Sequence, residues 1–322
     1  MKLLSLALLG GVAVVAATGG GLAAFAGLTA RRVEAALPPQ GRFIDIDGNR
    51  IHYLDQGSGP VVLMVHGLGG QMRNFTYALV DKLTDRFRVV VMERPGAGYS
   101  RRAPGASARL GVQADVVAKF IGALGLGKPL LIGHSLGGAL SLAVALEHPE
   151  AVGGLALVSP LTQPQDAPPK VFAGLYIPSP FLRRLLAWTV ATPLAIRNRD
   201  VVLAQVFGPE TAPDDFATRG GGVLNLRPRS FYATSTDLVA VSEDLPGFHA
   251  RYASLKLPVG IIFGEDDRIL DARVHGSPMT GQVPGLTYET IEAAGHMIPL
   301  TQPDRVGAFV TAVAGRVFGR TA

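Results

Sequence analysis

The sequence predicts a doubly wound α/β fold, in which helices cover both faces of a mostly parallel sheet. Two observations lead to this prediction: short, continuous apolar runs recur along the chain, and helical stretches separate them. Runs rich in Val and Ile, without polar alternation, fit strands that are buried on both faces of a parallel sheet. Regular alternation of such strands with helices is typical of α/β domains. The runs are Val61–Val65, Val89–Met92, Leu130–Ile132, Leu155–Val158 and Val259–Phe263, and Leu286–Ile291 is a further strand candidate.

An antiparallel hairpin is expected before the parallel strands. Phe43–Ile46 alternates apolar and polar residues, Asp47-Gly48-Asn49 provides a turn, and Ile51–Leu54 continues on its other side. Strand patterns joined by such a turn predict a β-hairpin. The helices expected between the later strands are Phe75–Leu83, Val112–Leu124 and Ala139–Glu147.

The alternation of strands and helices stops in residues 161–255. This part holds many prolines, shows helical apolar spacing around Phe181–Val190 and contains no run typical of a buried strand. We expect it to form a helical cap over the carboxyl ends of the strands, where open α/β sheets bind their ligands. The core then comprises residues 37–160 and 256–322.

Residues 1–36 are expected to form a separate segment. Leu3–Ala30 carries no charged residue and exceeds the roughly 20 apolar residues that a membrane-spanning helix needs, so its length favours a single-pass N-terminal anchor. Ala24-Phe25-Ala26 provides an alternative, because small residues at this spacing mark the cleavage site of a secreted protein. The short flanks, with Arg31 and Arg32 after the run, favour a cytoplasmic catalytic domain if the anchor is retained.

Composition excludes several classes of protein. With 48% hydrophobic and only 17% charged residues, the chain is not intrinsically disordered. The absence of cysteine excludes disulfides, thiolate metal sites and a cysteine nucleophile. The net charge of +5 comes from arginines that never cluster beyond pairs, which argues against nucleic-acid binding. No histidine spacing suits a metal site and no complete dinucleotide motif is present, so we predict no cofactor. Composition leaves the oligomeric state open.

Residues 133–137 read Gly-His-Ser-Leu-Gly and lie between the strand run at 130–132 and an Ala-rich helical stretch. A serine in this pattern, between a strand and a helix, occupies a strained turn that exposes its hydroxyl above the sheet. The flanking glycines let the strand and the helix approach closely. We therefore interpret Ser135 as a nucleophile. The alternative is a glycine-rich turn whose serine has no catalytic role.

Residues 66–70 read His-Gly-Leu-Gly-Gly and follow the first buried strand run. A glycine-rich turn at this place can direct a backbone N–H at a developing oxyanion, together with the N–H of the residue after the nucleophile. The two donors would be the amides of Leu68 and Leu136. We expect His66 to be a structural histidine that hydrogen-bonds the turn, and not a catalytic base.

Candidate acid and base residues follow the last two strand runs. A weakly nucleophilic serine needs a histidine to take its proton, and a carboxylate to orient that histidine. In hydrolases with the strand–serine–helix pattern, these residues occur in the order nucleophile, acid, histidine. His296, within Gly295-His296, fits the base. Asp266 and Asp267 both fit the acid, and Asp271 is a more distant candidate.

Taken together, these motifs resemble those of the α/β-hydrolase superfamily, in particular capped serine esterases and lipases. The resemblance extends from about Phe43 to Phe318. The HG-x-G turn of that superfamily is matched at 66–69, its [DE]-R-x-G-x-G-x-S motif at 93–100, its serine turn at 133–137, its G-x-x-D motif at 264–267 and its G-H pair at 295–296. The G-x-x-D match implies Asp267 as the acid. The resemblance also implies a cap between the sixth and seventh core strands.

The sequence therefore predicts a serine hydrolase of carboxylic esters, with Ser135, Asp267 and His296 as its triad and an acyl-enzyme intermediate. The resemblance separates it from relatives that open epoxides or remove halide, since those carry Asp in place of Ser135. The apolar stretch at 181–190 and the expected anchor suit a lipid-like or other hydrophobic ester, although ordinary packing of the cap onto the core is the more usual reason for such a stretch.

Other functions can use the same residues or the same fold. Acyl transfer, amide cleavage and carbon–carbon hydrolysis can all proceed from one triad, because the pocket and the exclusion of water decide between them. A binding protein without catalysis can also retain a hydrolase fold.

Overall fold

An eight-stranded sheet with the order β1-β2-β4-β3-β5-β6-β7-β8 runs through the protein. The computed structural model describes the backbone of residues 2–319 and the side-chain environment of residues 16–319. β1 (Arg42–Ile46) and β2 (Asn49–Gln56) form the expected antiparallel hairpin, and β2 pairs antiparallel with β4 (Arg88–Met92). The other strand pairs are parallel, which confirms the predicted fold class. The remaining strands are β3 (Val61–Val65), β5 (Leu130–His134), β6 (Gly154–Val158), β7 (Val259–Gly264) and β8 (Thr287–Ile291).

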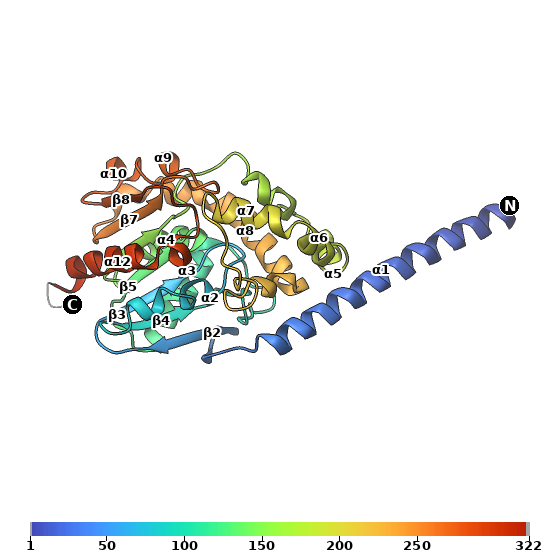
Figure 1. The fold of residues 1–322 in the computed structure, drawn as a ribbon, viewed down its shortest axis with the longest axis horizontal. Coiled ribbons are helices and arrows are strands. Elements are labelled where there is room, and N and C mark those ends of the chain that lie inside the picture. Colours follow the sequence, from blue (N-terminus) through green and yellow to red (C-terminus); the bar gives the residue numbers. More distant parts are fainter. Residues whose placement is uncertain (1, 320–322) are drawn as a thin grey trace.

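Both faces of the sheet are covered by helices (Figure 1). In β3, Leu63 and Val65 face one apolar layer, which includes α3 (Leu110–Ala123) and α4 (Leu136–Glu147). Val62 and Met64 face the opposite layer, which includes α12 (Pro303–Phe318). Because successive side chains of a strand point to opposite faces, a strand covered on both sides must be apolar at every position. This explains the continuous apolar runs in the sequence.

The helix expected over Phe75–Leu83 is divided into two short pieces, α2 (Arg73–Thr76) and the 3₁₀ helix η1 (Val80–Lys82). Phe75, Leu79, Val80 and Leu83 are all buried in the same apolar layer. With three residues per turn, the 3₁₀ helix aligns Val80 with Leu83, so both side chains reach this layer. Three other helices are single turns: α9 (Ala272–His275), α10 (Met279–Gln282) and α11 (Ile298–Thr301).

The chain between β6 and β7 is helical, and we call residues 161–255 the cap segment. Its longest helix, α8, packs against α3 and α4 of the core and against α5 within the segment. Figure 1 shows α5, α6, α7 and α8 together on the side of the sheet nearer α1. The helices of the cap segment are η2 (Lys170–Leu175), α5 (Pro180–Trp188), α6 (Ala191–Arg197), α7 (Arg199–Phe207), η3 (Gly222–Leu226), α8 (Pro228–His249) and η4 (Tyr252–Ser254).

The N-terminal segment is one long helix, α1 (Lys2–Ala36), whose far end projects from the body (Figure 1). The end nearer the body contacts α5, η3 and α8 of the cap segment. Ala26 and Val33 are buried on this part of the helix, and Glu34 accepts a hydrogen bond from the buried Arg227 at 3.2 Å. The last turns of α1 are therefore part of the folded body.

The expected single-pass membrane anchor is wrong, and with it the expected membrane localisation and membrane partner. Across the part of the chain that the structure describes, none of the helices combines the length and the hydropathy of a bilayer-spanning segment. Gly19, Gly20 and Gly21 dilute the apolar run, and Arg31 and Arg32 add charge to the same helix. The side chains of residues 1–15, where the predicted run begins, lie outside the described residues.

The packing of α1 on the cap segment predicts a difference between two neighbouring positions. Ala26→Glu places a charge at a fully buried site and should lower the free energy of unfolding by about 1–3 kcal/mol. Phe25→Glu, at a side chain that is 45% exposed, should have a clearly smaller effect. Denaturant unfolding followed by circular dichroism measures both. Equal effects of the two substitutions would contradict the packing described here.

Candidate active site

Ser135 lies at the turn between β5 and α4, where it is the residue that precedes the first turn of the helix. Its backbone has φ 56° and ψ −122°, in the left-handed half of φ space that residues with side chains rarely adopt. Such backbone strain persists only where the surroundings enforce it, and it concentrates at functional sites. The strained serine turn predicted from the sequence is therefore present.

The glycines of this turn are required by close approach of the backbone. A Cβ atom on Gly137 would lie 2.1 Å from the carbonyl oxygen of Val65 in β3. A Cβ atom on Gly133 would lie 2.5 Å from the carbonyl oxygen of Gly137. Any larger residue at either position would push α4 away from the sheet and displace Ser135.

His296 and Asp267 lie together after the neighbouring strands β8 and β7. His296 Nδ1 is 2.7 Å from Asp267 Oδ2. The other carboxylate oxygen, Oδ1, accepts hydrogen bonds from the amides of Ile269 at 2.8 Å and Leu270 at 2.9 Å. A carboxylate only accepts hydrogen bonds, so the proton of the neutral imidazole lies on Nδ1 and Nε2 keeps its lone pair.

The other candidate acids do not bond to His296. The Asp271 carboxylate accepts from the guanidinium of Arg273 at 2.8 Å and caps α9. The backbone N–H of Asp266 donates to the carbonyl oxygen of Ala294. Among the described residues, no hydrogen bond joins the Asp266 side chain to His296.

Ser135 and His296 belong to segments that contact each other directly. His134, the neighbour of Ser135, has its ring centroid 4.8 Å from that of His296. Its Nε2 is 3.0 Å from the carbonyl oxygen of His296, a bond that spans 162 positions of the chain. The end of β5 and the loop after β8 are thereby fastened to each other.

The glycine-rich turn after β3 lies against the serine. A Cβ atom on Gly67 would be 2.7 Å from the Cβ of Ser135 and 3.2 Å from its Oγ. Within the described residues, the amides of Leu68 and Leu136 donate to no backbone acceptor. For Leu136 this follows from its place at the start of α4, since the first N–H groups of a helix have no partner within it.

His66 is built into this turn as a neutral residue. Its Nδ1 donates to the carbonyl of Gly67 at 2.9 Å, and its Nε2 accepts from the amide of Arg94 at 3.1 Å. Burial, reinforced by the nearby Arg94 charge, holds the pKa of His66 well below its usual value. A histidine with both ring nitrogens engaged and no tendency to take a proton is not positioned as a general base.

Three residues around the site carried no assigned role in the sequence. Arg94 belongs to the motif matched at residues 93–100 but received no role of its own. Glu210 and Asp237 belong to the cap segment. Glu210 Oε2 accepts from the amide of Gly295 at 3.1 Å, and its Oε1 accepts from Gln302 Nε2 at 2.7 Å. It thus supports the turn that carries His296. Nothing in the local sequence distinguishes either cap carboxylate from a solvated one.

No metal centre adjoins these residues: in the described part of the chain, no group of three or more His, Asp or Glu side chains is placed to hold an ion.

The buried histidines His134 and His275 predict how the free energy of unfolding depends on pH. Burial lowers the pKa of His275 to about 4 and that of His134 to about 3. Between pH 6.5 and 5 the unfolded chain therefore takes up protons that the folded chain does not. The free energy of unfolding should fall with pH in this range, by up to about 1.4 kcal/mol per pH unit for each residue.

Replacing the histidine outside the candidate site tests this. His275→Asn should make the decline between pH 6.5 and 5 shallower by about one histidine's share, as measured by urea unfolding at each pH. A slope equal to that of the wild type would contradict the burial effect at His275.

Comparison with known proteins agrees with the fold. A family model described as "alpha/beta hydrolase fold" matches residues 60–303. The chain is similar to haloalkane dehalogenase 2 of Mycobacterium tuberculosis, with 27% identity over 85% of this chain and 94% of the relative. It is also similar to a 2-hydroxy-6-oxononadienedioate/2-hydroxy-6-oxononatrienedioate hydrolase of Burkholderia vietnamiensis, with 26% identity over 81% of this chain and 89% of the relative.

A solved structure covers more of the chain. The crystal structure of a bacterial membrane phospholipase A superposes with a TM-score of 0.65 and 25% identity, over 98% of this chain and 99% of that one. The relatives thus share the fold and the hydrolase class while their named substrates differ.

Proposed function

This chain belongs to the alpha/beta hydrolase family, and from that premise we propose that it is a serine hydrolase that cleaves carboxylic esters. The proposal rests on one observation above the others. A serine in a strained turn follows His134, whose ring centroid lies 4.8 Å from that of His296, and His296 Nδ1 is hydrogen-bonded to a buried aspartate. This arrangement leaves Nε2 of His296 as the atom that can accept a proton from Ser135.

The proposed reaction has two halves. The Oγ atom of Ser135 attacks the acyl carbonyl carbon while His296 Nε2 takes its proton, and Asp267 stabilises the imidazolium that forms. His296 then returns the proton to the leaving alcohol, which leaves an acyl group on Ser135. A water molecule, deprotonated by His296, then attacks the acyl carbonyl carbon. The bond from that carbon to Oγ breaks, His296 returns the proton to Oγ of Ser135, and the carboxylic acid leaves.

The amides of Leu68 and Leu136 stabilise the negative charge that develops on the carbonyl oxygen in both halves. Both amides lack a backbone partner among the described residues, and Gly67 brings the first of them next to Ser135. One donor of this kind contributes roughly 10²–10³ to the rate.

The similarity to a dehalogenase does not extend to its chemistry under this proposal. A carboxylate that displaces halide from a saturated carbon forms an ester, which water can then hydrolyse. Ser135 would instead form an ether, which has no carbonyl for water to attack, so the enzyme could not turn over. Esters avoid this difficulty because their acyl group keeps a carbonyl throughout.

For the substrate, we favour hydrophobic esters. Apolar side chains are exposed on α5 of the cap segment, with Phe181 at 79%, and Leu185 and Trp188 about half exposed. The similarity to a phospholipase A supports the same class. We also propose that residues 161–255 act as a cap on a core of residues 37–160 and 256–322, so that α5 and α8 help to shape the substrate site.

A second candidate is hydrolysis of a carbon–carbon bond by the same triad, which the similarity to the Burkholderia hydrolase favours. Acyl transfer and amide cleavage also use the same residues. A binding protein without turnover is the alternative from another class. A panel of esters, amides, acyl acceptors and vinylogous diketones separates these possibilities. Turnover of diketones in preference to every ester would replace the leading proposal.

Removal of the nucleophile provides the first prediction for this function. Ser135→Ala should lower ester turnover by about 10⁶, because the remaining triad members contribute little without it. Steady-state kinetics with a chromogenic ester measure this. Unchanged secondary structure by circular dichroism controls for folding, and near-normal turnover in the folded variant would overturn the assignment.

A pair of adjacent carboxylates provides the second. Asp267→Asn should lower kcat by about 10⁴, because an amide no longer fixes the required tautomer of His296. Asp266→Asn, one position away and not bonded to His296, is the matched control and should change kcat by less than about 3-fold. The reverse ranking of the two variants would identify Asp266 as the acid instead.

A further inference from the structure

The carbonyl oxygen of Gly67 is held by three donors. Arg94 Nη2 donates to it at 3.0 Å, His66 Nδ1 at 2.9 Å and the amide of Gly70 at 3.2 Å. In a trans peptide, the carbonyl and the following N–H lie in one plane and point in opposite directions. Holding the oxygen of Gly67 therefore fixes the direction of the Leu68 N–H, which is one of the two proposed oxyanion donors.

Arg94 is the charged member of this set, and its position depends on the cap segment. Its guanidinium also donates from Nε to the carbonyl of His66 at 3.1 Å and from Nη1 to Asp237 Oδ2 at 2.6 Å. The side chains of Arg94 and Asp237 are 0% and 2% exposed. A charge buried this deeply requires a counterion, and Asp237 is the only carboxylate paired with Arg94 among the described residues.

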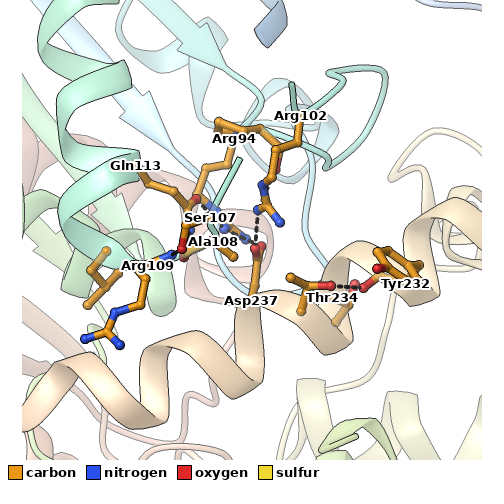
Figure 2. A network of polar contacts seen from close by, with 12 residues as sticks. Arg94, Arg102, Ser107, Ala108, Arg109, Gln113, Tyr232, Thr234 and Asp237 are labelled. Atoms are coloured by element: carbon orange, nitrogen blue, oxygen red, sulfur yellow. Dashed lines mark hydrogen bonds and ion pairs between the residues drawn. The ribbon is translucent and has the colours of Figure 1, made fainter. Parts of the chain in front are cut away.

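Asp237 is itself fixed from a second side. Its Oδ1 accepts from Arg102 Nη2 at 2.5 Å. Figure 2 shows both arginines reaching Asp237, which projects toward them from α8. Because α8 belongs to the cap segment, a residue of that segment is connected through Arg94 to the Gly67 carbonyl in the glycine-rich turn at residues 66–70.

We propose that Asp237 is a positioning residue that orients the Leu68 amide through Arg94. This inference rests on the proposed function, in which that amide stabilises the oxyanion. If α8 moves away from the core, the counterion of Arg94 moves with it, and the Gly67 carbonyl loses the charged one of its three donors. The oxyanion site is therefore complete only while α8 is in place.

Helix α8 carries a second buried carboxylate that serves as a matched control. Asp244 accepts from the amide of Leu110 at 2.6 Å and pairs with Arg109, so it also fastens α8 to the core. Its partners Arg109 and Leu110 lie at the start of α3, and within the described residues neither is hydrogen-bonded directly to residues 66–70. One indirect connection runs through Gln113, whose amide donates to the Arg109 carbonyl at 3.0 Å and whose Oε1 accepts from Arg94 Nη1 at 3.2 Å. Replacing Asp244 leaves the Asp237–Arg94 pair in place. If a replacement only loosened the cap segment, kcat should fall in both variants. If it displaces the Leu68 amide, kcat should fall only in the Asp237 variant.

The test compares Asp237→Asn with Asp244→Asn in the full chain, using an ester that the wild type hydrolyses. Asp237→Asn should lower kcat by about 10²-fold with KM within about 3-fold, as expected when one oxyanion donor is displaced. Asp244→Asn should keep kcat within about 3-fold. An equal loss of kcat in both variants, or a loss in Asp237→Asn that lies only in KM, would overturn the proposal.

Asp237→Asn leaves Arg94 buried without a counterion, so it can fail to fold. Asp237→Glu then decides by the same criterion. It keeps the charge but moves the carboxylate by one methylene group, and kcat should fall by about 10-fold with KM unchanged, since displacements of about 1 Å in catalytic groups are costly. Wild-type kcat in this variant would contradict the proposal.

Hydrogen–deuterium exchange separates a failure of this inference from a failure of the proposed function. Exchange in the peptide covering residues 66–70 should be faster in the folded Asp237 variant than in the wild type, and unchanged in Asp244→Asn. This measurement needs no substrate. If the wild type hydrolyses no ester, the proposed function fails, while unchanged exchange at 66–70 overturns the role of Asp237.

Discussion

The proposed chemistry depends on the hydrogen bond between His296 Nδ1 and Asp267 Oδ2. That bond fixes the tautomer of the imidazole, so that Nε2 keeps a lone pair for a proton of Ser135. Both partners are buried, and charge-assisted hydrogen bonds are stronger where water is excluded. The order of the strands explains this arrangement. β7 and β8 are parallel neighbours, Asp267 follows the end of β7, and His296 follows the end of β8, so the two residues lie at the same edge of the sheet.

The strained conformation of Ser135 is maintained by its backbone partners. The amide of Ser135 donates to the carbonyl of Val158 at 3.1 Å, and its own carbonyl accepts from Gly138 at 2.8 Å and from Leu161 at 3.0 Å. Strain of this kind costs about 1–3 kcal/mol and persists when several contacts determine the backbone. Two carboxylates of the cap segment bond to other parts of the candidate site. Asp237 accepts from Arg94, which also holds the Gly67 carbonyl, and Glu210 accepts from the amide of Gly295, next to His296.

The sequence predicted what is encoded locally. Each buried strand is a continuous apolar run, and glycines mark the turn around Ser135, so the sheet and the position of this turn could be located without a structure. The contacts of the cap segment could not be predicted in this way. Asp237 lies 143 positions from Arg94, and the residues around a carboxylate on a helix do not indicate which distant residue it pairs with. Residues 1–36 were misjudged for a different reason. The prediction rested on the number of consecutive uncharged residues, whereas Gly19, Gly20 and Gly21 lower the hydropathy of that stretch.

The central claim is that the hydroxyl of Ser135 is an activated nucleophile. Covalent labelling of the folded protein with a fluorophosphonate, followed by intact-mass and peptide mass spectrometry, tests it most directly because no knowledge of the substrate is needed. We predict one adduct per chain, located on Ser135. Folded protein that acquires no adduct, or acquires it at another residue, would contradict the account.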